Sequence, residues 1–169
     1  MALRQPSEET HATDPRWDEV RAWDEQFYAH VFVTPEEYEH TAVVRTDGDE
    51  LELADGRRLL DFTSGLLCVN AGQRNERIRA AIVAALDRYG YVWEGFATDL
   101  RARAAKLIVD DLLGPDGWAG RMRFTSSGSE AVELALLVAK LVTGRPNVIS
   151  RDFAYHGWTH GALSLMGLP

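Results

Sequence analysis

The stretch RFTSSGSEAVELALLVAKLVTGRPNVISRDFAYHG, residues 123–157, decides the fold expected for this chain. Met122 and Phe124 alternate with arginines as in a half-buried strand, and apolar residues then recur at helical spacing from Ala131 onward. A second apolar run, residues 147–150, follows this helix. The order strand, helix, strand is typical of a parallel sheet and predicts an α/β fold.

The turn that leads into this helix contains Ser127, Gly128 and Ser129. Ser127 and Glu130 have the spacing of a capping box, so the helix is expected to begin here. A helix N-terminus offers free N–H groups and the positive end of the helix dipole, and the two hydroxyls add further donors. The pattern is compatible with a phosphate-binding turn, and also with a serine-rich cap that has no ligand. The turn matches neither a Walker A loop nor a Rossmann fingerprint.

A second turn, with Tyr155, His156 and Gly157, ends the second predicted strand. The carboxyl ends of parallel strands lie at one edge of a sheet, so both turns should face the same crevice. His156 and His160 are four residues apart, but Gly157 stands where a zincin motif has glutamate, and no metal site is expected.

The N-terminal half predicts a different architecture. Residues 1–13 are polar and are expected to form a flexible tail, and Asp14 with Pro15 predicts a helix start. Two Asp-Gly turns predict a small β meander over residues 42–62. Two helices should follow, one capped by Asn75 and one over about residues 98–113. The first helix should carry an apolar stripe formed by Trp17, Val20, Trp23, Phe27 and Val31.

The composition predicts a soluble globular protein. Of 169 residues, 46% are hydrophobic and 26% charged, and the net charge of −8 without a basic cluster argues against nucleic acid or an anionic membrane as a partner. The lone cysteine, Cys68, is expected to be a small buried side chain in a reducing compartment. We find neither a signal-peptide pattern nor a long apolar run, and a cytoplasmic location is expected.

Four segments taken together resemble the class III aminotransferases, pyridoxal phosphate enzymes of fold type I. The matching segments occur in the order found in that family: DGRRLLDFTSGL (55–66), FTSSGSEAVELALLVAK (124–140), TGRPNVIS (143–150) and YHGWTHGALS (155–164). The resemblance implies a mixed α/β chain in which residues 14–74 are a small-domain segment. Residues 75–169 would then begin the large, mainly parallel-sheet domain that binds the cofactor.

The resemblance also implies roles for individual residues. The turn at residues 127–129 would hold the phosphate of pyridoxal 5'-phosphate, Tyr155 would stack on its ring, and His156 would lie beside the pyridinium end. Glu133 matches an acidic position close to the cofactor. Residues 63–69 match a loop that lines the substrate pocket, and residues 93–96 a variable region that contributes to pocket and dimer. The implied cofactor-binding residues are Ser127, Gly128, Ser129, Glu133, Tyr155 and His156.

No catalytic residue is expected in this chain. The family places its Schiff-base lysine and its acidic partner of the pyridine nitrogen well downstream of the Tyr-His-Gly motif, and neither Lys106 nor Lys140 aligns with that lysine. The resemblance therefore implies amino transfer between an amine or amino acid and a 2-oxo acid, with the lysine supplied by a missing segment or a companion chain. A homodimer or a complementary chain is the expected partner. The alternatives are a non-catalytic cofactor-binding or docking module and an inactive truncated fragment.

Overall fold

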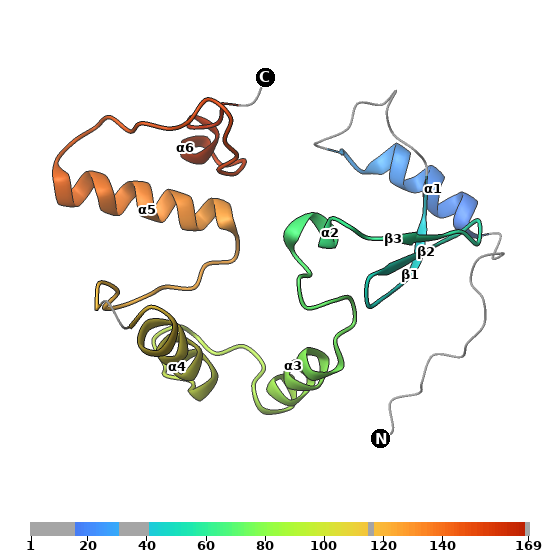
Figure 1. Cartoon of the computed structure of the whole chain (residues 1–169), viewed down its shortest axis with the longest axis horizontal. Coiled ribbons are helices and arrows are strands. Elements are labelled where there is room, and N and C mark those ends of the chain that lie inside the picture. Colours follow the sequence, from blue (N-terminus) through green and yellow to red (C-terminus); the bar gives the residue numbers. More distant parts are fainter. Residues whose placement is uncertain (1–15, 31–40, 115–116, 168–169) are drawn as a thin grey trace. The chain divides into compact units, whose positions relative to one another are not determined.

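The computed structural model describes residues 16–30, 41–114 and 117–167. The chain divides into two compact units, Met1–Val92 and Trp93–Pro169, and each is described by itself (Figure 1). The sequence-based boundary between residues 74 and 75 refers to the domains of the family, and it remains a prediction.

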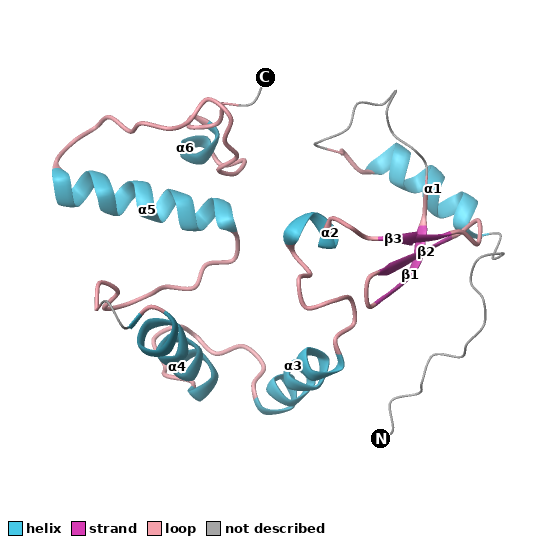
Figure 2. Cartoon of the chain, viewed as in Figure 1, coloured by secondary structure: helices cyan, strands magenta, loops and turns pink. Residues whose placement is uncertain are grey.

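The N-terminal unit contains a helix and an antiparallel sheet, which Figure 2 distinguishes by colour. The predicted meander is confirmed, because each strand pairs with the next along the chain, with a register irregularity near the start of the first strand. The predicted helix start at Asp14 and Pro15, and Val31 of the apolar stripe, lie outside the described residues. The elements are α1 (Arg16–Phe27), β1 (Val43–Asp47), β2 (Glu50–Leu53) and β3 (Arg58–Leu60).

Glycines make the two tight turns of the meander. Gly48 and Gly56 have φ angles of +56° and +85°, a region that residues with a side chain rarely adopt. Leu53, at the end of β2, is only 1% exposed and is the most buried large side chain among the described residues of this unit. The predicted Asp-Gly hairpins therefore form, and they surround a very small core.

A loop and a capped helix complete the N-terminal unit. The loop contains the single turn α2 (Ser64–Leu67) and is joined to the meander by backbone hydrogen bonds between Gly48 and Gln73. Helix α3 (Glu76–Arg88) begins as predicted at Asn75, whose side chain accepts hydrogen bonds from the amides of the first turn.

The second unit is mainly helical. The predicted helix over residues 98–113 begins as α4 (Asp99–Lys106) and continues as the π-helical segment η2 (Leu107–Leu112). Helix α5 (Gly128–Thr143) ends at Gly144, which has the left-handed conformation typical of a helix C-terminus. The short helix α6 (His160–Leu163) packs against α5.

The two predicted strands of the parallel sheet are not formed within the described residues. Residues 122–124 and 147–150 are assigned no regular structure, and Ile149 is 98% exposed. The prediction was wrong for these segments because a parallel strand needs neighbouring strands for its hydrogen bonds and helices over both faces. The described residues offer neither segment such a neighbour.

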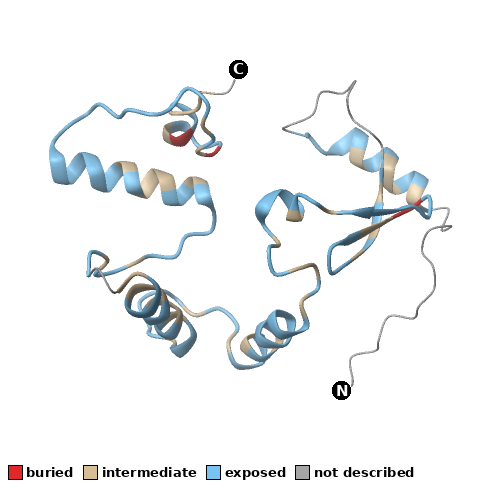
Figure 3. Cartoon of the chain, in the orientation of Figure 1, coloured by how far each residue is buried: buried red, intermediate tan, exposed pale blue. Residues whose placement is uncertain are grey.

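Few side chains of the described residues are buried, as the colours of Figure 3 show. Leu53, Ala54 and Ala162 are the buried apolar residues, whereas the apolar faces of α3 and α5 are largely exposed. Cys68 is also exposed, which corrects the prediction of a buried thiol, because no other described segment covers its loop. None of the helices in the described ranges has the length and apolar content that crossing a membrane requires.

Candidate functional site

The predicted phosphate turn forms the N-terminus of α5. Ser127 is the N-cap, and its Oγ accepts a hydrogen bond from the Glu130 amide at 3.2 Å. The Glu130 carboxylate in turn accepts one from the Ser126 amide at 2.7 Å, one residue earlier than an ordinary capping box requires. The amides of Gly128 and Ser129 belong to the first turn, where a helix has no acceptors for its N–H groups. These two amides and the Ser127 hydroxyl proton could therefore serve an anion.

The structure brings the second predicted turn against the first. The Trp158 amide donates a hydrogen bond to Ser129 Oγ at 3.2 Å. A Cβ atom at Gly157 would lie 2.7 Å from Ser129 Cβ and 2.9 Å from its Cα, closer than real side chains approach. Gly157 also has a φ angle of +122°. Glycine is therefore required here for two reasons, the backbone conformation and the contact with the N-terminus of α5.

Glu133 joins α5 to α6 at the same end of the helix. Its Oε1 accepts hydrogen bonds from the amides of Gly161 at 2.7 Å and Ala162 at 3.1 Å. A hydrogen bond from the Thr159 side chain is the main reason that the pKa of Glu133 lies below its usual value, and the amides of Ala162 and Gly161 act in the same direction. Glu133 therefore caps α6 as a carboxylate.

Tyr155 and His156 precede the contact made by Gly157. The Tyr155 ring is exposed and His156 is half-buried. Gly157 lies against Ser129, and Tyr155 and His156 directly precede Gly157 in the chain. The backbone of Tyr155 and His156 is therefore held close to the N-terminus of α5. Of the predicted cofactor-binding residues, Ser129 and Glu133 thus contact the segment that follows Tyr155 and His156.

A pocket of about 510 Å³ borders the phosphate turn. Arg123 and Glu94 form a two-pronged ion pair at its edge, with N–O distances of 2.6 and 2.8 Å. The hydrogen bond and the charge of Arg123 lower the pKa of Glu94. Arg101 donates to the Glu94 and Phe96 carbonyls and so fixes the turn at residues 93–96. The pocket is lined by Glu94, Arg123, Phe124, Thr125, Ser126, Glu130 and Leu134.

Sequence reasoning did not single out Glu94 or Arg123. They are separated by 29 residues, and nothing in the local pattern links one to the other. Only the opposite signs of their charges could have suggested the pair. Glu94 lines this pocket, and the contribution of residues 93–96 to a substrate pocket stays a prediction.

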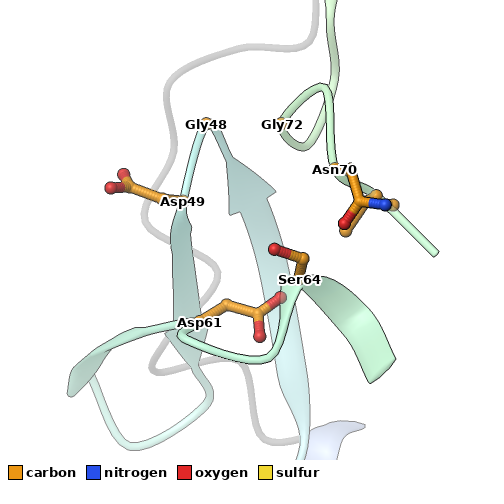
Figure 4. A pocket seen from close by; sticks show the side chains of 7 residues that line it. Gly48, Asp49, Asp61, Ser64, Asn70 and Gly72 are labelled. Atoms are coloured by element: carbon orange, nitrogen blue, oxygen red, sulfur yellow. The ribbon is translucent and has the colours of Figure 1, made fainter. Parts of the chain in front are cut away.

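The loop predicted to line the substrate pocket is organised by Asp61. Its carboxylate accepts hydrogen bonds from the Thr63 amide at 3.2 Å, the Thr63 hydroxyl at 2.9 Å and the Gly65 amide at 2.7 Å. The hydrogen bond from the Thr63 side chain is the main reason that the pKa of Asp61 is lowered. In Figure 4 the Asp61 carboxylate lies close to Ser64, whereas Asp49 points away from both.

The backbone of this loop is left-handed over one turn. Ser64, Leu66 and Leu67 have φ angles of +51°, +57° and +67°, which cost a residue with a side chain roughly 1–2 kcal/mol each. Such conformations persist where the surrounding structure enforces them, and they are frequent at functional sites. A pocket of about 340 Å³ adjoins the turn, lined by Gly48, Asp49, Asp61, Ser64, Val69, Asn70 and Gly72.

The two lysines lie on helices outside these turns. Lys106 Nζ lies 3.1 Å from the Asp110 carboxylate in the next turn of the helix. The hydrogen bond and charge of Asp110 raise the pKa of Lys106, which is opposite to what a lysine nucleophile requires. Lys140 lies near the C-terminal end of α5.

Comparison with known proteins shows which family the chain represents. The model of the family described as aminotransferase class-III matches residues 33–168, and the chain therefore belongs to the class III aminotransferases. The fold is that of a fold type I chain. It includes the left-handed loop at residues 64–67, the serine-glycine-serine start of α5 and the close packing of Gly157.

Three relatives illustrate the similarity. The chain is 39% identical over 143 residues to a probable aminotransferase of Mycobacterium tuberculosis, covering 78% of this chain and 29% of the relative. It resembles an S-selective transaminase from Arthrobacter sp. with alanine bound, at 49% identity and a TM-score of 0.82, covering 89% of this chain and 32% of that one. It also resembles the taurine:2-oxoglutarate aminotransferase of Bifidobacterium kashiwanohense in complex with PLP and glutamate, at 29% identity and a TM-score of 0.80, covering 89% and 33%. The chain thus spans about a third of these proteins.

Proposed function

We propose that this chain is the cofactor-phosphate-binding part of a pyridoxal phosphate-dependent aminotransferase. The observation that carries the proposal is the contact between the N-terminus of α5 and the turn at Gly157, found in a chain of the class III family. It combines a helix N-terminus with two serine hydroxyls at one place.

The residues at this place suit a phosphate group. Ser127 Oγ and Ser129 Oγ each accept a hydrogen bond from a backbone amide, so the proton of each hydroxyl is left to donate outward. The first-turn amides of Gly128 and Ser129 add two donors, and the helix dipole favours a negative charge. Four donors at one helix end are a suitable set for phosphate oxygens.

The remaining site residues receive their roles from this anchor. By resemblance to the family, Tyr155 would lie over the pyridine ring and His156 beside its protonated end. The contact of Gly157 with Ser129 supports these roles, because it holds the segment that carries both residues close to the phosphate turn. The cofactor, when bound, supplies the electron sink that makes amino transfer possible. The residues of this chain bind and orient the cofactor. They do not supply its covalent link, since neither Lys106 nor Lys140 aligns with the Schiff-base lysine of the family.

The lysine and the acid that complete the site would come from polypeptide beyond these residues or from a companion chain. Lys106 is already paired with Asp110, and its raised pKa keeps it protonated. The exposed apolar faces of α3 and α5 need covering by further elements of the fold. We propose a homodimer or a complementary chain for this purpose, in the reducing cytoplasm expected for a chain with one cysteine.

The substrates proposed are an amine or amino acid as the donor and a 2-oxo acid as the acceptor. The similar transaminase from Arthrobacter has alanine bound, and the similar taurine:2-oxoglutarate aminotransferase is in complex with PLP and glutamate. In this chain the left-handed loop at residues 63–69 and the turn at residues 93–96 would contribute to the pocket, and residues 14–74 and 75–169 would belong to the small and large domains.

A second function is a module that binds the cofactor phosphate, or docks on another polypeptide, without catalysis. The observation that favours it is that Asp110 engages Lys106 in a chain that also has the serine-glycine-serine helix start. An inactive fragment would retain neither specific binding nor a functional partner.

The test is the absorption spectrum of the purified protein with pyridoxal phosphate, before and after borohydride, alone and with any polypeptide that co-purifies with it. Cofactor fixed to a lysine outside residues 1–169 would support the aminotransferase. Binding that borohydride never makes covalent would favour the module. Fixation at Lys106 or Lys140 would contradict the proposed division of roles. The absence of specific binding would contradict both the aminotransferase and a cofactor-binding module.

A further inference from the structure

We infer that Glu133 is a positioning residue for the cofactor phosphate, acting through α6 on the hydroxyl of Ser129. The inference rests on the proposed function, because the phosphate is the group whose binding Glu133 would control. Glu133 does not itself belong to the donor set at the helix N-terminus, since an anionic carboxylate would repel a phosphate at close range.

The first step of this coupling is the cap on α6. Glu133 Oε1 accepts hydrogen bonds from the Gly161 and Ala162 amides, and the Thr159 side chain also donates to the carboxylate. Ala162 is fully buried at this contact, and a side chain at Gly161 would collide with the carboxylate. The start of α6 is therefore held in one position relative to α5.

The second step leads from α6 back to the phosphate turn. Thr159 is the N-cap of α6, and the residue before it, Trp158, donates its amide to Ser129 Oγ. Only one peptide unit separates the group held by Glu133 from the group that contacts Ser129. A shift of Thr159 would therefore move the Trp158 amide away from the Ser129 hydroxyl.

The third step is the orientation of the hydroxyl proton. While the Trp158 amide occupies a lone pair of Ser129 Oγ, the hydroxyl proton is directed elsewhere. Without that amide the hydroxyl is free to turn its proton to another acceptor, and one of the phosphate donors is lost. Glu133 and Ser129 lie one helical turn apart on α5 and therefore share one face of that helix. The series of contacts through α6 thus begins and ends on α5.

The structure also explains why a carboxylate suits this position. Three donors converge on it, two amides and one hydroxyl, and it has lone pairs for all of them. A glutamine would keep one oxygen but present an NH2 group as a further donor. The Glu133→Gln variant should therefore loosen the start of α6 while changing the size of the side chain very little.

The experiment compares binding of pyridoxal phosphate and of pyridoxal, which lacks the phosphate, to the assembly that binds the cofactor. Wild type, Glu133→Gln and Ser129→Ala are measured by absorbance titration, together with the double variant. Glu76→Gln, which alters an exposed helical glutamate paired with Arg79, is the matched control. Circular dichroism establishes that each variant is folded.

We expect Glu133→Gln to weaken pyridoxal phosphate binding about tenfold, as for one hydrogen bond to a charged group, and to leave pyridoxal binding nearly unchanged. In the Ser129→Ala background the same substitution should have little further effect, because both act on one hydroxyl. The control should match the wild type. If Glu133→Gln does not fold, Thr159→Val is measured instead, because it removes one of the three donors. It should also weaken binding of pyridoxal phosphate more than binding of pyridoxal, by a smaller factor.

Two results would overturn the inference. Equal losses for pyridoxal phosphate and pyridoxal, or full additivity with Ser129→Ala, would mean that Glu133 only stabilises the fold. If the wild-type protein has no phosphate-dependent preference at all, the proposed function fails and the inference fails with it. The wild-type titration therefore separates the two failures.

Discussion

Gly157→Ala tests the contact on which the candidate site depends. The added Cβ would lie 2.9 Å from Ser129 Cα and 2.7 Å from its Cβ, whereas carbon atoms at rest are about 3.5–4.0 Å apart. The turn would have to withdraw from α5 by roughly 0.8 Å or more. Forcing a side chain into this crowded place costs about 1–3 kcal/mol, and holding alanine at a φ of +122° costs about another 1–3 kcal/mol.

A total of about 2–6 kcal/mol exceeds what one hydrogen bond, such as that from the Trp158 amide to Ser129, contributes on balance. The turn should therefore open locally while the helices remain. Hydrogen–deuterium exchange of the peptide covering residues 155–163 should speed up about thirtyfold or more, since each factor of ten corresponds to about 1.4 kcal/mol.

The matched control is Gly120→Ala, because an added Cβ there meets nothing within 4 Å. It should leave the exchange of residues 155–163 unchanged. A change of less than about threefold in Gly157→Ala would refute the reasoning, because the energy cost would then be below about 0.7 kcal/mol. The close approach of Gly157 to Ser129 would not exist in solution.

Two further predictions concern the N-terminal unit. Asn75→Ala removes the acceptor for the Arg77 and Ile78 amides and should lower the unfolding free energy in urea by about 1 kcal/mol, whereas Asn75→Asp should retain most of it, and an equal loss in both would contradict the capping role. The pKa of Asp61 is lowered in the folded state, mainly by Thr63, so its stabilising effect is present above the unfolded value near 3.8 and is lost as pH falls through the folded value. Asp61→Asn should therefore make the unfolding free energy depend less on pH in the acid range. An unchanged pH dependence would count against this assignment.

Local features were predicted well because they depend on residues close in sequence. The Asp-Gly turns, the cap at Asn75 and the start of α5 at Ser127 are each specified by a few neighbouring residues, and all are confirmed. The family was also recognisable, because its motifs occur in order along the chain. The assignment of cofactor-binding roles to individual residues remains a prediction.

Other features could not be read from local patterns. The left-handed turn at residues 64–67 is held by the hydrogen bonds that Asp61 accepts, and apart from Gly65 its residues have no preference for that conformation. The strands predicted at residues 122–124 and 147–150 failed because strand formation requires partners from other parts of a sheet. Cys68 is exposed for a similar reason, since burial depends on what covers a side chain.

The sequence by itself determined the family, the helix caps, the hairpins and the presence of a serine-glycine-serine turn, because these follow from short-range geometry and ordered motifs. The tertiary structure alone decided that Gly157 lies against Ser129, that Glu133 caps α6 and that Arg123 pairs with Glu94. Each of these contacts joins residues 28 or 29 positions apart. Such contacts form only when the chain between them folds back, and that path is set by packing and backbone conformation rather than by neighbouring residues.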